Sequence, residues 1–110
     1  MTETMLVTTI EALPGKRLEP LGLARGSTVR AKHIGSDIVA GLRNIVGGEI
    51  KEYAALLGGA REQAMDRMIE DARRMGADAI VGARFETSTI TQQASEVLAY
   101  GTAVRILGDA

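Results

Sequence analysis

The clearest pattern of hydrophobic and polar positions along the chain is helical and runs from about Glu49 to Met75. Its apolar residues recur at intervals of three or four, at Tyr53, Leu57, Ala60, Ala64, Met68, Ala72 and Met75. This spacing places them on one side of a helix, and Gly76 follows as a residue suited to the left-handed C′ position. Gly58 and Gly59 each cost about 1 kcal/mol relative to alanine in a helix, so we expect a kink or a close backbone approach there. The pattern predicts one long amphipathic helix.

Four other segments have the composition or the alternation typical of β-strands. They are Met5–Ile10, Leu18–Lys32, Ala79–Ile90 and Glu96–Leu107. The first ends before the turn signal Leu13-Pro14-Gly15. Proline cannot donate to a strand ladder, so Pro20 belongs at a strand start or a sheet edge. Ahead of the long helix, Gly35-Ser36-Asp37 offers an N-cap for a short helix that Gly47-Gly48 would end.

The two C-terminal strands differ in how their faces alternate. In Ala79–Ile90 the alternation predicts Val81, Ala83 and Phe85 on one face and Arg84, Glu86 and Ser88 on the other. In the last strand both faces are nearly apolar: Val97, Ala99, Gly101 and Ala103 alternate with Leu98, Tyr100, Thr102, Val104 and Ile106. A small sheet covered by one helix buries only one face. The second apolar face must meet something else, most simply another copy of the chain.

These elements belong to a single compact domain over residues 1–110, which contains strands, one long amphipathic helix and a short preceding helix. The chain has 110 residues, 13 Lys and Arg against 14 Asp and Glu, and no Cys. Without Cys, disulfides, thiolate nucleophiles and cysteine-ligated zinc or iron–sulfur centres are excluded. A near-neutral charge argues against nucleic-acid binding. No apolar run approaches the roughly 20 residues that span a bilayer, so we expect a cytoplasmic protein that binds neither nucleic acid nor membrane.

Several ordered blocks resemble the YbjQ-like family of small bacterial and archaeal proteins. They are Gly41–Gly48, Tyr53 with Ala60–Glu62, Met75–Gly82, Arg84–Ser88 and Glu96–Val104. The resemblance covers nearly the whole chain. It implies a dodecin-like α+β subunit in which a long helix packs on an antiparallel sheet. It also implies a ring-shaped homopentamer and a family label of heavy-metal binding, while the family's function is not established.

One departure from the family bears on that label. Where some members carry a Cys just before the glycine of the second strand, this chain reads Pro20-Leu21-Gly22. Soft thiolate ligands select heavy-metal ions, so the departure weakens a heavy-metal role here.

His33, Glu86 and Glu96 are the candidate ligands for a divalent metal ion. His33 is the sole histidine, and one imidazole cannot build a zinc site within a monomer, although copies could converge at a ring axis. A surface position or the start of a helix is the simpler interpretation. Glu86 and Glu96, on adjacent strands, could bind a hard cation or act as acid and base. The simpler interpretation is that they form cross-strand salt bridges with Arg84 and Arg105.

Arg43, Asn44 and Tyr100 are the candidate residues for binding a cofactor or small ligand. Arg43 and Asn44 stand beside Gly47-Gly48, where helix N-termini and glycine amides could meet a phosphate. The run is neither a P-loop nor a GxGxxG fingerprint. The favoured interpretation is therefore structural, with Asp37 complementing the helix dipole and the glycines separating two helices.

The leading hypothesis is a non-enzymatic, ring-forming protein that binds a small ligand or a divalent ion at subunit interfaces or along the ring axis. One alternative is an enzyme with an interface site built from Arg43, Glu86, Glu96 and Tyr100. The other is a structural scaffold that binds a partner protein.

Overall fold

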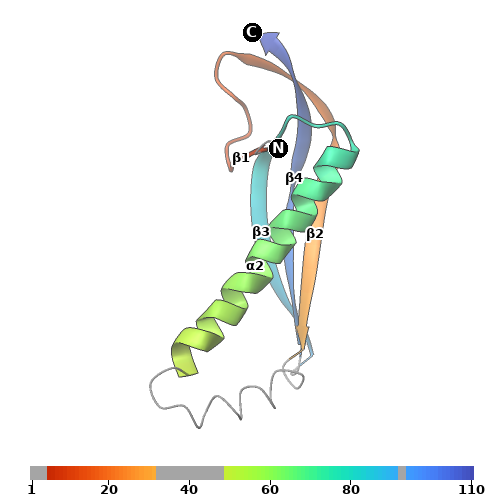
Figure 1. The fold of residues 1–110 in the computed structure, drawn as a ribbon. Helices are drawn as coiled ribbons and strands as arrows, with labels where there is room; N and C mark the ends of the chain where they lie inside the picture. Colours follow the sequence, from red (N-terminus) through yellow and green to blue (C-terminus); the bar gives the residue numbers. More distant parts are fainter. Residues whose placement is uncertain (1–4, 32–48, 92–93) are drawn as a thin grey trace.

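A computed structural model describes residues 5–31, 49–91 and 94–110 of the chain. The elements are β1 (Leu6–Val7), β2 (Lys16–Ala31), α2 (Glu49–Arg74), β3 (Ala79–Thr91) and β4 (Ala94–Asp109). They form two layers, in which α2 crosses one face of the sheet diagonally (Figure 1). The fold is α+β, as predicted. The short helix predicted between Asp37 and Gly47 lies outside the described residues, as do His33, Arg43 and Asn44.

The sheet has four strands in the order β1-β3-β4-β2. β4 is antiparallel to both β2 and β3, whereas β1 pairs with β3 in parallel. The prediction of an antiparallel sheet is therefore wrong at β1. The loop after β1 crosses the sheet on the side opposite α2, where Leu13 packs against Val81 and Val104. The loop thus connects β1, which lies beside β3, to β2 at the opposite edge of the sheet. Pro20 lies at a register shift in this edge strand, as its missing N–H requires.

A β-bulge at Gly82 changes which residues of β3 share a face. Val81 is opposite Thr102, but the next paired residue, Arg84, is opposite Tyr100. Gly82 takes a φ of 61°, a left-handed conformation that suits glycine. Val81 consequently packs on the side opposite α2, while Ala83 packs in the cluster beneath the helix. The prediction that Val81 and Ala83 share a face is wrong, because strict alternation does not allow for the extra residue.

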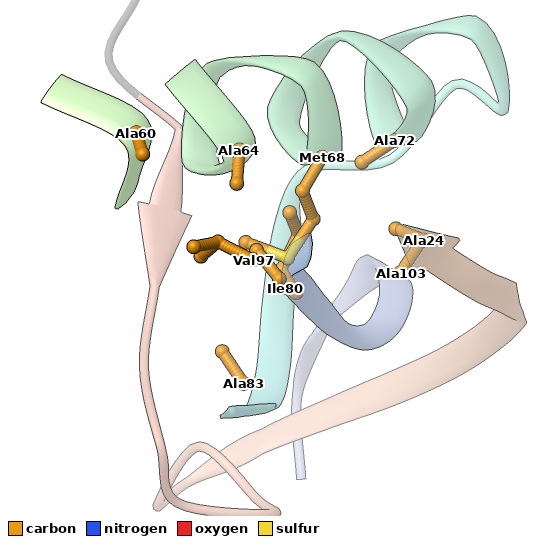
Figure 2. Packing of buried hydrophobic residues seen from close by; sticks show 10 residues of the cluster. Ala24, Ala60, Ala64, Met68, Ala72, Ile80, Ala83, Val97 and Ala103 are labelled. Atoms are coloured by element: carbon orange, nitrogen blue, oxygen red, sulfur yellow. The ribbon is translucent and has the colours of Figure 1, made fainter. Parts of the chain in front are cut away.

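The core between α2 and the sheet is built mainly from small side chains. Ala60, Ala64, Met68 and Ala72 of α2 are all buried, which confirms the predicted apolar stripe there. Figure 2 shows Met68 reaching from the helix toward Ile80 and Val97 on the sheet. Met68 and Ile80 are the largest fully buried side chains among the described residues. The core is therefore thin.

Glycine allows the helix to approach β2 closely. A Cβ added at Gly26 would clash with the main-chain nitrogen of Met68 and the carbonyl oxygen of Ala64. At Gly59, by contrast, an added Cβ would meet no described residue within 4 Å, so of the two predicted alternatives, a kink or a close approach, the close approach is not found at Gly59. α2 is helical through both Gly58 and Gly59 and ends before Gly76, whose φ of 82° confirms the predicted left-handed residue.

The molecule is elongated, with principal extents of 57 × 27 × 24 Å. Its radius of gyration is 17.5 Å, against about 13 Å for a compact domain of about 100 residues. Among the described residues, no helix is long and apolar enough to cross a bilayer. A thin core in an elongated molecule leaves much of the sheet without cover from the other described residues.

Candidate functional site

The sheet face opposite α2, here called the open face, brings together three rows of side chains. Directly paired residues on neighbouring strands lie on the same face. The rows across β2, β4 and β3 are Arg25–Tyr100–Arg84, Ser27–Leu98–Glu86 and Val29–Glu96–Ser88. Three sequence-predicted candidates, Glu86, Glu96 and Tyr100, therefore lie on one face within adjacent rows.

A hollow of about 440 Å³ lies over these rows. It is lined by Leu23, Arg25, Ser27, Glu86, Glu96, Leu98 and Tyr100, and we call it the glutamate hollow. Leu98 lies between Ser27 on β2 and Glu86 on β3. Glu86 and Glu96 are diagonal neighbours, whose Cα atoms are expected to lie about 7 to 8 Å apart. The lining of the hollow thus combines apolar side chains with charged groups.

The charged groups of the hollow are not neutralised by one another. Tyr100 Oη donates to Glu86 Oε1 at 3.4 Å, which is long for an O–H···O hydrogen bond. Within the described residues, neither Glu86 nor Glu96 forms an ion pair. With Arg25 as its cation, the hollow carries two carboxylates against one guanidinium. These groups can therefore attract ligands of either sign.

The predicted salt bridges from Arg84 and Arg105 to the two glutamates are wrong. Arg84 Nη1 instead donates to the carbonyls of Thr9 at 3.0 Å and Ala83 at 2.9 Å. Arg105 Nη1 lies 3.3 Å from Glu19 Oε1, its cross-strand partner on β2. Arg105 follows Val104, which packs on the open face, so alternation turns Arg105 to the helix side of the sheet. Both guanidinium groups therefore bond to groups other than the two glutamates.

Comparison with known proteins places the chain in a family. A family model described as "Putative heavy-metal-binding" matches residues 5–107. The chain belongs to this YbjQ-like family.

Its relatives are named UPF0145 proteins, and three of them show the extent of the match. The one from Methanosarcina acetivorans is 54% identical over 104 residues, which cover 94% of this chain and 98% of the relative. The one from Thermus thermophilus is 54% identical over 103 residues, covering 93% and 90%. The one from Archaeoglobus fulgidus is 53% identical over 107 residues, covering 96% and 99%.

A solved structure supports the fold of this YbjQ-like chain. It is a crystal structure of a protein of unknown function from the DUF74 family of Pediococcus pentosaceus. The TM-score is 0.64 at 16% identity, and the match covers 93% of this chain and 97% of that one. At this identity the likeness shows the fold alone.

The described residues of this YbjQ-like chain do not fit a heavy-metal site within one subunit. The sequence has no Cys, and the described part of the chain holds no group of three or more His, Cys, Asp or Glu that could bind a metal. Heavy-metal ions prefer soft sulfur ligands. The donors in the glutamate hollow are carboxylate, phenol and hydroxyl oxygens, which suit hard cations and polar organic groups.

Sequence analysis missed Leu23, Arg25 and Ser27 as lining residues of the hollow. All three lie on β2, which pairs with β4 although the two strands are far apart in the sequence. Two register shifts in that pairing, near Leu18 and Leu21, hide the alignment from pattern alone. A second hollow of about 400 Å³, whose lining includes Glu11, Val81 and Val104, was also missed. It depends on the loop after β1, whose path the sequence does not indicate.

Proposed function

We propose that this protein is the subunit of a ring-shaped homo-oligomer and binds a small polar ligand in the glutamate hollow, at the interface between subunits. The observation that carries the proposal is the open face, where charged and apolar groups line one hollow that no other described part of the chain covers. Five copies and a dodecin-like subunit are the arrangement that the family resemblance implies.

The assembly follows from what one copy leaves exposed. Both faces of β4 are apolar, yet α2 covers only the face of Val97, Ala99 and Ala103. On the open face Leu23 remains 56% exposed, and Leu98 and Tyr100 are half-buried. A neighbouring copy over this face would bury these side chains and close the hollow, gaining roughly 25 cal/mol for each Å² of apolar surface removed from water.

The ligand chemistry follows from the charges around the hollow. Arg25 stands on the β2 side, whereas Glu86 and Glu96 stand on β3 and β4. A small organic molecule with an ammonium group near the carboxylates and an anionic group near the guanidinium would satisfy both sides. Leu23 and Leu98 would contact its apolar part. Few polar groups placed around an apolar surface are typical of small-molecule sites.

A hard divalent cation is the second candidate ligand. Glu86 and Glu96 lie on one face in adjacent rows and have no ion-pair partner within the described residues. Calcium and manganese accept carboxylate oxygen. One subunit supplies only these two carboxylates in the hollow, so the partner copies or water would complete the coordination.

Calorimetric titration with free amino acids as zwitterionic probes, and separately with Mn²⁺, tests the site. We expect Glu86→Gln and Glu96→Gln to weaken binding at least about tenfold, or about 1.4 kcal/mol, because each removes a charge that faces the ligand. Glu62→Gln, on the exposed side of α2, is the matched control and should bind as the wild type does. Equal binding by all three variants, or none by the wild type, would contradict the proposal.

A further inference from the structure

The two edges of the sheet are protected to different extents. β2 forms one edge, and β3 forms the other beyond the short β1. β1 pairs only with Ala79 and Ile80. The loop after β1 extends this cover to Gly82 and Ala83, through bonds from their N–H groups to the carbonyls of Ile10 and Thr8. Beyond Ala83, β3 continues to Thr91.

The hydrogen bonds of Ala83 show which main-chain groups of β3 point away from β4. Its N–H donates to Thr8 at 2.9 Å, and its carbonyl accepts from Arg84 Nη1 at 2.9 Å. Main-chain groups alternate in direction along a strand. The N–H and C=O groups of Phe85, Thr87 and Thr89 therefore point to the same outer side as those of Ala83.

The corresponding groups on β2 are capped by side chains of α2. The Arg25 N–H donates to Asp71 Oδ2 at 3.1 Å, and Arg67 Nη1 donates to the Ser27 carbonyl at 2.6 Å. Within residues 5–31, 49–91 and 94–110, no side chain caps Phe85, Thr87 or Thr89 in this way. Within the described residues, the chain thus caps one edge with its own helix and leaves three residues of the other edge without such a cap.

The open edge also lacks the usual safeguards of an edge strand. Between Phe85 and Thr91 the sequence contains no Lys, Arg or Pro, and Glu86 is its sole charged residue. Natural proteins normally protect an exposed edge with such residues or cover it. Phe85 is 45% exposed and Ile90 is 56% exposed. A run of Thr, Ser, Ile and Phe favours pairing with another strand.

We infer that the outer edge of β3 from Phe85 to Thr89 pairs with a strand of a second copy of this chain, which extends the sheet across the subunit boundary. The inference rests on the proposed homo-oligomer. A second copy is the occupant because this edge adjoins the open face: Glu86 lies between Phe85 and Thr87 and lines the glutamate hollow. A copy paired at the edge would therefore stand beside the hollow, on its β3 side.

Hydrogen exchange on the unmodified protein tests the inference without a mutation. In the assembled protein, we expect the amides of Phe85, Thr87 and Thr89 to exchange at least about 100-fold more slowly than unprotected amides, as do amides within a ladder. Rapid exchange of these three amides in a protein that is oligomeric by native mass spectrometry would overturn the inference and leave the proposed assembly standing. A monomer would overturn both. Protection by a bound chain of different mass would overturn the choice of a second copy.

A pair of variants at Thr87 isolates the main-chain group. Thr87→Pro removes an outward N–H that β4 does not use, so we expect it to lose the oligomer while keeping its circular dichroism spectrum. Thr87→Val keeps the N–H and the branched side chain and should assemble as the wild type does. An oligomer that persists in folded Thr87→Pro would overturn the inference, and hydrogen exchange decides the matter where this variant does not fold.

Discussion

Gly26 is the residue on which the packing of the two layers depends most directly. A side chain there would meet the main chain of α2 at Met68 and Ala64 rather than a flexible side chain. Backbone cannot move aside without shifting the whole helix away from β2. Because Gly26 has no side chain, α2 can pack directly against β2.

We expect Gly26→Ala to lower the free energy of unfolding by about 1 to 3 kcal/mol, the usual cost of overpacking a core. Gly59→Ala is the matched control, because it adds the same methyl group within a helix at a position with no described neighbour within 4 Å. It should raise stability by up to about 1 kcal/mol. Urea denaturation of both variants at one fixed protein concentration measures the difference. Equal stabilities would contradict the packing described for Gly26.

Sequence analysis locates some special glycines and misses others for a physical reason. Gly76 follows an apolar helical stripe, so its role is readable from local pattern and its left-handed φ confirms it. The role of Gly26 depends on which face of a distant helix packs against β2. Gly58 and Gly59 were predicted to mark a kink or a close backbone approach, whereas the close approach lies at Gly26, because a glycine in sequence does not show what lies opposite it in space.

Among the elements, α2 both covers the sheet and caps its β2 edge. Asp71 accepts the main-chain N–H of Arg25 and lies 3.2 Å from Arg74. Its carboxylate is partly buried, with 26% of the side chain exposed. This residue therefore joins the C-terminal half of the helix to the middle of the edge strand.

We expect Asp71→Ala to destabilise the protein by about 1 to 3 kcal/mol, because it leaves a strand N–H without its charged acceptor. Glu70→Ala is the matched control, since Glu70 makes an exposed ion pair with Arg73 at 3.7 Å. Such surface pairs contribute about 0 to 1 kcal/mol. Thermal unfolding of both variants measures the effect. A loss for Glu70→Ala as large as that for Asp71→Ala would contradict the capping role.

The kinds of element could be predicted from the sequence, but their pairing could not. Periodicity locates α2, β3 and β4 to within a few residues, because each carries an apolar pattern over most of its length. The bulge at Gly82 then reverses the face of Val81, and the loop after β1 makes that strand parallel to β3. Both features depend on contacts between segments far apart in the chain. The glutamates were predicted as a pair, yet the hollow also requires Arg25 and Ser27, which only the β2–β4 register places there.

At the scale of the whole molecule, assembly was predicted because both faces of β4 are apolar. The structure shows which residues of β4 lie on each face. Ala99 and Ala103 are fully buried beneath α2, so they belong to the subunit core. Leu98 and Tyr100 lie on the open face. A charge at Leu98 therefore tests association, whereas a charge at Ala99 would test folding.

Native mass spectrometry of untagged protein, with Leu98→Glu beside the wild type, tests the central claim most directly. We expect the wild type at five times the 11.6 kDa mass of one chain. Leu98→Glu should appear as a folded monomer, because it places a charge in the proposed interface. Leu107→Glu, at an exposed leucine near the end of the same strand, should remain assembled. A wild-type protein that is monomeric at micromolar concentration would contradict the account.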